Sequence, residues 1–197
     1  GNNKWIVNNS YDGLGIYPNT ISEDSTFSGI IGGAPFSKYM HIHDSQAATS
    51  QGVSNANYDS SNASDRFTEK TTGMCTVGMT NIKLSFFYLC VGDSTAYGEV
   101  YYSANSVTWT KVGLAKYNNT NKWKYDTISN PAFDNIPNLR FGFRWVNSSS
   151  GGQSSTSFAL DDIQVIGTYD DVTNPVTINI TSIPTTVCAG QTLNLSF

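Results

Sequence analysis

The sequence predicts an all-β protein folded as a two-sheet antiparallel sandwich. β-Branched, aromatic and turn-forming residues are abundant in the 197-residue chain, whereas the good helix formers Glu, Lys, Ala and Leu are scarce. Short runs of alternating apolar and polar residues recur along the chain, separated by clusters of Gly, Asn, Ser and Pro. About nine such runs at this spacing are typical of a β-sandwich. We expect no α-helix.

The expected strands cover residues 5–7, 38–43, 66–72, 81–91, 97–102, 107–112, 122–128, 139–146 and 158–166. The strands at 97–102 and 107–112 are separated by a Ser-Ala-Asn-Ser turn and predict a hairpin. The strand at 139–146 is the clearest, because its apolar residues share one face and Arg140 and Arg144 share the other. The polar stretch 45–65 predicts a long surface loop.

Composition divides the chain into a sandwich over residues 1–168, a linker over 169–175 and the beginning of an incomplete second β module over 176–197. The last segment has two strand-like runs, which are too few to bury a core of their own. We therefore expect the molecule to continue past Phe197, and Cys188 to pair with a cysteine beyond it.

The three cysteines predict one disulfide within the sandwich. Cys75 and Cys90 flank strand-like stretches, and closing a loop of roughly 15 residues would stabilise the fold by about 3 kcal/mol. A low content of charged residues, 13%, and a surface rich in Ser, Thr and Asn fit a secreted protein, in which such a bond persists. The alternative is a pair of buried free thiols.

Several classes of function are disfavoured by the sequence. A net charge of −4 argues against sequence-independent nucleic-acid binding, which needs a basic face. No apolar run approaches the roughly 20 residues of a membrane-spanning helix. The GxSxG, HExxH and P-loop motifs are all missing, so we expect no enzyme, although a pair of carboxylates for glycoside hydrolysis remains an open alternative.

Several stretches together resemble a known family of modules. They are WIVNNSY (5–11), YMHI (39–42), YGEVYYS (97–103) leading to VTW (107–109), LRFGFRWVN (139–147) and FALDDI (158–163). They resemble jelly-roll modules of surface proteins that gliding bacteria secrete by the type IX route, and are similar to MAM, reelin-type and haemagglutinin adhesin sandwiches. The resemblance covers about residues 5–167, and VCAGQTL (187–193) resembles the start of an Ig-like or PKD-like repeat.

The resemblance implies a jelly-roll module that is secreted, attached to the cell surface and non-catalytic, often with a structural Ca²⁺ ion. Its implied role is adhesion or cell-surface structure. The implied partners are cell-surface or matrix glycans or proteins, neighbouring β modules of the same chain, and the export machinery. These are expectations from family likeness, because a fold does not by itself fix a function.

Asp161 and Asp162 are the candidate calcium ligands. Asp161 has the strand parity of Ile163 and Val165, so we expect its carboxylate to point toward the core, where it needs a cation or several donors. Calcium prefers carboxylate and carbonyl oxygens. The resemblance also places the ion here, with groups near the N-terminal strand. The alternative is that the carboxylates of Asp161 and Asp162 accept hydrogen bonds from backbone N–H groups or pair with Arg140 or Arg144.

Aromatic residues crowd two or three neighbouring strands and point to sugar binding. Sugar rings stack on exposed aromatic faces, and a polar rim binds their hydroxyl groups. Trp109 and Trp145 look structural. Trp123 and Tyr125, which follow an Asn-rich turn, are the better candidates for ligand binding. His41 and His43 share a strand face and are expected to be exposed, without a third metal ligand.

Three short motifs resemble bacterial O-glycan acceptor sites, in which an acidic residue precedes a hydroxyl residue. They would place glycans on Ser25, Ser94 and Thr127.

These observations favour an adhesion or structural module. The alternative is a carbohydrate-binding module that targets an attached enzyme to polysaccharide.

Overall fold

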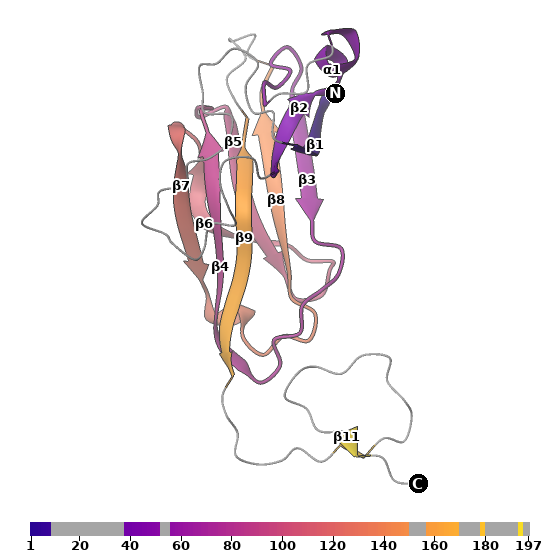
Figure 1. The fold of residues 1–197 in the computed structure, drawn as a ribbon, viewed down its shortest axis with the longest axis vertical. Helices are drawn as coiled ribbons and strands as arrows, with labels where there is room; N and C mark the ends of the chain where they lie inside the picture. Colours follow the sequence, from indigo (N-terminus) through magenta and orange to yellow (C-terminus); the bar gives the residue numbers. More distant parts are fainter. Residues whose placement is uncertain (9–37, 52–55, 150–156, 170–177, 180–192, 195–197) are drawn as a thin grey trace.

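In the part of the chain that the structure describes, nine antiparallel strands form two facing sheets, which confirms the all-β, two-sheet sandwich (Figure 1). The computed structural model describes residues 1–8, 38–51, 56–149, 157–169, 178–179 and 193–194. The five-stranded sheet has the order β1 (Asn3–Asn8), β2 (Tyr39–Asp44), β9 (Ala159–Tyr169), β4 (Met79–Cys90), β7 (Thr120–Ser129). The four-stranded sheet has the order β3 (Ser64–Glu69), β8 (Arg140–Asn147), β5 (Ala96–Ser103), β6 (Thr110–Tyr117).

The chain alternates between the two sheets, as in a jelly roll. Among the nine described strands of the sandwich, only β1–β2 and β5–β6 are consecutive strands that pair within one sheet, and β5–β6 is the hairpin expected from the sequence. Every other step from β2 to β9 crosses from one sheet to the other.

Alternation along each strand builds the core between the sheets. The even-numbered apolar residues of β4 and the odd-numbered ones of β8 point inward, and the largest of them are fully buried. The main buried cluster includes Leu84, Phe86, Phe141, Phe143 and Trp145. Trp145 has no exposed surface, so its predicted structural role is confirmed.

The stretch 45–65 differs from the long loop expected from the sequence. Its first residues form the helix α1 (Ser45–Gln51), and its end belongs to β3. The Asp44 side chain accepts a hydrogen bond of 2.8 Å from the backbone N–H of Gln46, which caps the helix. A polar helix of about two turns lacks the apolar periodicity by which longer helices are found in a sequence. A 3₁₀ turn, η2 (Pro131–Phe133), follows β7.

The predicted Cys75–Cys90 disulfide is wrong. Cys90 is a buried free thiol at the end of β4, and Cys75 lies before the start of that strand. A strand of 12 residues spans roughly 35–40 Å, whereas a disulfide needs Cα atoms about 4.4–6.8 Å apart. Cys75 is itself disulfide-bonded. Cys188 lies outside the described residues.

Two short strands lie in the segment expected to open a second β module. β10 (Ile178–Asn179) and β11 (Leu193–Asn194) pair in parallel as a separate two-stranded sheet. The predicted linker at 169–175 lies outside the described residues except for Tyr169, which ends β9. No helix in the described part of the chain is long and apolar enough to cross a membrane.

Candidate functional site

The outer face of the four-stranded sheet carries a cluster of three aromatic side chains, Phe67, Tyr101 and Trp109, which we call the aromatic platform. The ring of Phe67 lies 4.8 Å from that of Trp109 and 5.9 Å from that of Tyr101, both edge-to-face. Phe67 remains 42% exposed, and the other two rings are half-buried. Edge-to-face pairs of this kind hold rings in fixed orientations.

Glycine at position 142 makes room for the platform. Gly142 lies in β8 beside Glu69 of β3 and Tyr101 of β5. A Cβ atom at this position would approach the Phe67 ring to 2.3 Å and the Trp109 ring to 3.0 Å. The rings therefore rest directly on backbone, and any larger residue would displace them.

Charged groups that are paired with one another border the platform. Arg144 binds Asp65 with two hydrogen bonds, of 2.8 and 2.5 Å, and binds Glu99 at 2.9 Å. Glu99 also accepts hydrogen bonds from Lys111 at 2.5 Å and from the Tyr101 hydroxyl at 2.7 Å. A bidentate guanidinium–carboxylate pair fixes the orientation of both groups.

A further ion pair lies on the other side of Gly142, where Arg140 binds Glu69 at 3.4 Å. The six charged side chains that border the platform carry three positive and three negative charges, on Arg140, Arg144 and Lys111 and on Asp65, Glu69 and Glu99, respectively. Together these six side chains have no net charge.

The pKa shifts agree with this pairing. Burial by itself would raise the pKa of Glu99, but hydrogen bonds from Lys111, Tyr101 and Arg144 outweigh it and hold the pKa below its ordinary value. The hydrogen bonds from Arg144 lower the pKa of Asp65. Both carboxylates are therefore charged at neutral pH and act as hydrogen-bond acceptors. The arrangement offers rigid apolar ring surfaces beside fixed donors and acceptors, which is the chemistry of a binding surface.

The aromatic surface continues along the same face. Lys116 places its ammonium group 4.1 Å from the centre of the Tyr97 ring. Tyr97 belongs to β5 and has the same parity as Glu99 and Tyr101, so it faces the same side of the sheet.

Sequence reasoning missed this site. Trp109 was expected to be structural, but it lies on the outer face against Phe67 and is only half-buried. One signal was available: in β3, Phe67 has the same strand parity as Asp65 and Glu69, so an aromatic ring shares a strand face with two carboxylates. An aromatic residue on an otherwise charged strand face is expected to point outward rather than into the core.

Trp123 and Tyr125, the residues expected to bind a ligand, lie on the opposite side of the sandwich. Both face outward from β7, and both are half-buried. Trp123 packs edge-to-face on the buried Tyr39 with the rings 5.6 Å apart, and Tyr125 lies 5.1 Å from Phe87. Trp123 and Tyr125 therefore belong to a second aromatic cluster. Their role in ligand binding remains a prediction.

His41 and His43 share a strand face as expected, but neither is exposed. His41 has no exposed surface and lies 2.7 Å from the side-chain oxygen of Asn8 and 3.0 Å from the carbonyl of Ile42. Burial, more than any other cause, lowers the pKa of His41 to about 4. The expectation of exposure failed because β2 is covered on its outer face, which strand alternation cannot reveal.

Asp161 is buried, as expected, but on the outer face of the five-stranded sheet rather than toward the core. It pairs with Phe87, whereas Leu160 pairs with the core residue Tyr88. A register shift follows between Ser85 and Phe87, and Asp162 takes a positive φ of 45°. This β-bulge reverses the parity, so Ile163 and Asp161 face opposite sides.

The predicted calcium site therefore remains a prediction. The Asp161 carboxylate accepts a hydrogen bond of 2.9 Å from the backbone N–H of Asp162. Within the described ranges, no three His, Cys, Asp or Glu side chains gather closely enough to hold a metal ion. Arg140 and Arg144, the alternative partners, face outward from the other sheet and bind Glu69, Asp65 and Glu99 instead.

The predicted glycosylation sites fall in different environments. Ser94 is exposed in the turn between β4 and β5, and Thr127 is exposed on β7. Ser25 lies outside the described residues. Glycans on these hydroxyl groups remain a prediction.

No family model matches the chain, and no curated protein matches it. Among solved structures, the carbohydrate-binding module TmCBM61 in complex with β-1,4-galactotriose aligns with a TM-score of 0.42 and 10% sequence identity, over 68% of this chain and 73% of that chain. A similarity of this size assigns neither a family nor a ligand.

Proposed function

We propose that this protein is a carbohydrate-binding module and that the aromatic platform is its sugar-binding surface. The observation that supports this most is the Phe67–Trp109 pair, exposed on the backbone of Gly142 and bordered by side chains already fixed by ion pairs. The C–H groups of a pyranose pack on the electron-rich face of an aromatic ring, while its hydroxyl groups need fixed donors and acceptors alongside.

Charge balance narrows the class of ligand to neutral glycans. Each of the six charged groups that border the platform has an opposite partner within 3.4 Å, so the platform itself offers no excess of either sign to a uronic acid, a sulfated sugar or an amino sugar. Because the ion pairs exist before a ligand arrives, little side-chain entropy is lost on binding. The surface would bind a glycan and leave its bonds intact.

An adhesion role is compatible with this surface. A module that binds neutral glycans attaches its carrier to cell-surface or matrix polysaccharide, and the same contact would direct an attached enzyme to its substrate. The secreted location, the structural Ca²⁺ ion and the type IX export route are predictions from family resemblance.

The test is a glycan array probed with the native chain and with Trp109→Ala. The matched control is Val107→Ala, because Val107 is 81% exposed and lies two positions away. We expect a subset of neutral glycans to bind the native chain and the control equally, and Trp109→Ala to bind at least about tenfold more weakly, as for loss of a stacked ring. Failure of every neutral glycan to bind, or equal binding by Trp109→Ala, contradicts the proposal.

A further inference from the structure

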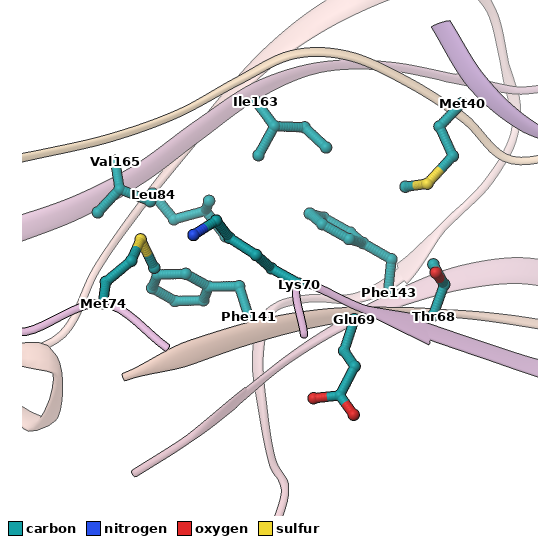
Figure 2. Close-up of a pocket in the computed structure, with 10 residues that line it drawn as sticks. All are labelled: Met40, Thr68, Glu69, Lys70, Met74, Leu84, Phe141, Phe143, Ile163 and Val165. Atoms are coloured by element: carbon teal, nitrogen blue, oxygen red, sulfur yellow. The ribbon is translucent and has the colours of Figure 1, made fainter. Parts of the chain in front are cut away.

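Asp65 is the most exposed of the three carboxylates that border the aromatic platform. Its side chain is 58% exposed, against 32% for Glu69 and 7% for Glu99. Glu99 already accepts hydrogen bonds from three side chains. Glu69 also lines a pocket between the two sheets, and Figure 2 shows its carboxylate directed away from the apolar residues of that pocket. Asp65 is therefore the carboxylate most open to a ligand.

Arg144 holds the Asp65 carboxylate in one orientation. Its Nε atom lies 2.8 Å from Asp65 Oδ1, and its Nη2 atom lies 2.5 Å from Asp65 Oδ2. Each carboxylate oxygen accepts one hydrogen bond among the described contacts and has room for about two. The guanidinium group has five N–H donors, and its described hydrogen bonds use four: two to Asp65, one to Glu99 and one to the Tyr101 hydroxyl. Donor and acceptor capacity for a ligand therefore lies side by side.

The Phe67 ring leans away from this ion pair. Phe67 is paired in register with Arg144, but the Cζ end of its ring lies over Gly142, two residues further along β8. Asp65 and Phe67 have the same strand parity, so both face outward from β3, about 7 Å apart along the strand. The β8 residue paired with Asp65 is the half-buried Val146, which faces the same side. The carboxylate therefore stands between apolar groups and beside any sugar ring that stacks on the platform.

The Asp65–Arg144 pair favours hydroxyl groups over ions as its ligand. A cation bound to Asp65 would also lie beside Arg144, and an anion bound to Arg144 would also lie beside Asp65. A hydroxyl group both donates and accepts, so it can donate to the carboxylate and accept from the guanidinium group. Hydroxyl groups on adjacent carbons of a pyranose lie close enough together to reach the two oxygens of one carboxylate. Hydrogen bonds to a charged group also contribute more than those between neutral groups.

We infer that Asp65 determines which glycans the module binds, because its two oxygens accept hydrogen bonds from two adjacent hydroxyl groups of the sugar stacked on Phe67 and Trp109. The ligand is then a neutral glycan whose bound pyranose keeps both of these hydroxyl groups unsubstituted. Arg144 is the positioning residue, since it fixes the carboxylate before the sugar arrives. This inference rests on the proposed function, because it needs a sugar on the platform.

The first test compares Asp65→Asn with Asp134→Asn by calorimetric titration with the neutral oligosaccharide that binds most tightly on the glycan array. Asp134 is the matched control, because it also accepts one hydrogen bond on each carboxylate oxygen, from the backbone N–H groups of Asn81 and Ile82 in the other sheet. We expect Asp65→Asn to bind about tenfold more weakly and Asp134→Asn to bind like the native chain. Native-like binding by Asp65→Asn, or equal losses in the two variants, overturns the inference.

Monodeoxy analogues of the same oligosaccharide separate a direct contact from a structural role of Asp65. We expect two analogues, which lack adjacent hydroxyl groups of one pyranose, to bind the native chain about tenfold more weakly than the parent sugar. Asp65→Asn should bind these two analogues as it binds the parent sugar, because the partner of the missing hydroxyl groups is already gone. If Asp65→Asn instead weakens the binding of every analogue by the same factor, or if no adjacent pair of hydroxyl groups matters, the inference is wrong.

The two experiments distinguish a failure of this inference from a failure of the proposed function. If neutral glycans bind the native chain and Trp109→Ala weakens them, but Asp65→Asn does not, the platform binds sugar and Asp65 does not select it. If no neutral glycan binds the native chain, the proposed function fails and this inference fails with it.

Discussion

The rings of Phe67 and Trp109 lie 4.8 Å apart at 68° to each other, and both rest on the backbone of Gly142. One ring comes from the edge strand β3 and the other from the turn before β6, so strands from both sides of β8 build the platform. The rest of the sheet fixes the geometry of the pair, because β3 and β5 both pair with β8 over most of its length.

Gly142→Ala is expected to weaken glycan binding more than stability. The added methyl group would come within 2.3 Å of the Phe67 ring, which is exposed enough to swing away rather than unfold the sheet. We expect a stability loss of about 1 kcal/mol together with a loss of affinity of about tenfold. Thermal melts and calorimetric titration measure the two effects.

The control for Gly142→Ala is Gly78→Ala. Gly78 has a φ of 73° and no atom near its missing Cβ, so alanine there costs about 1 kcal/mol through backbone strain alone. The Gly78→Ala variant should have a melting temperature lowered by about as much as that of Gly142→Ala, and it should bind glycan like the native chain. Equal affinity losses in the two variants would mean that stability, not the platform, determines binding.

Glu99→Gln is expected to remove part of the acid sensitivity of the fold. The pKa of Glu99 lies below its ordinary value of 4.5, so this carboxylate stabilises the folded state above pH 4.5 and loses that contribution as pH falls through its folded pKa. The variant should lose about 2 kcal/mol at pH 7, because Lys111 and Arg144 lose a charged acceptor. Urea unfolding at pH 7, 5 and 3 measures both effects, and a parallel pH dependence in the two proteins would contradict the assigned role.

His41→Gln is expected to flatten the loss of stability between pH 6.5 and pH 4. Burial lowers the pKa of His41 from 6.5 to about 4, so the unfolded chain takes up a proton in this interval that the folded chain does not. The free energy of unfolding therefore decreases as the pH decreases from 6.5 to 4, and His41 contributes up to about 3 kcal/mol to this decrease. The pKa of His43 is also lowered, so the difference between native and variant unfolding curves isolates His41. Identical slopes would show that His41 is protonated within the fold.

Cys90 is expected to resist alkylation until the protein unfolds. Complete burial raises the pKa of the Cys90 thiol to about 12, so neither access nor thiolate is available in the native state. Iodoacetamide at pH 8 should leave the native protein unmodified, and in denaturant without reductant it should modify Cys90 and leave Cys75 unmodified. Peptide mass mapping distinguishes them. Modification of the native protein, or protection of Cys90 in denaturant, would be inconsistent with this arrangement.

Alternation in the sequence was sufficient to predict the sandwich, most clearly in β8, whose inward residues are aromatic and whose outward residues Arg140 and Arg144 are charged. It failed at Asp161, since the bulge at Asp162 depends on pairing with β4 and leaves no local signal. It also failed at Trp109, which precedes β6, because the face to which a residue outside a regular strand points is set by tertiary packing.

The cysteines show a further limit of sequence reasoning. Loop length alone made Cys75 and Cys90 a plausible pair, yet a long strand separates them in space. The charge pairs around Arg144 were equally inaccessible, since Asp65, Glu99 and Lys111 come from three different strands. Only the strand order of the sheet brings them together.

Backbone amide shifts of the ¹⁵N-labelled protein, followed during titration with a neutral oligosaccharide selected on the array, test the sugar-binding surface most directly. We expect the largest changes at Phe67, Trp109 and Gly142, with smaller ones at Lys111 and Arg144. Changes confined to the opposite face, around Trp123 and Tyr125, would contradict it.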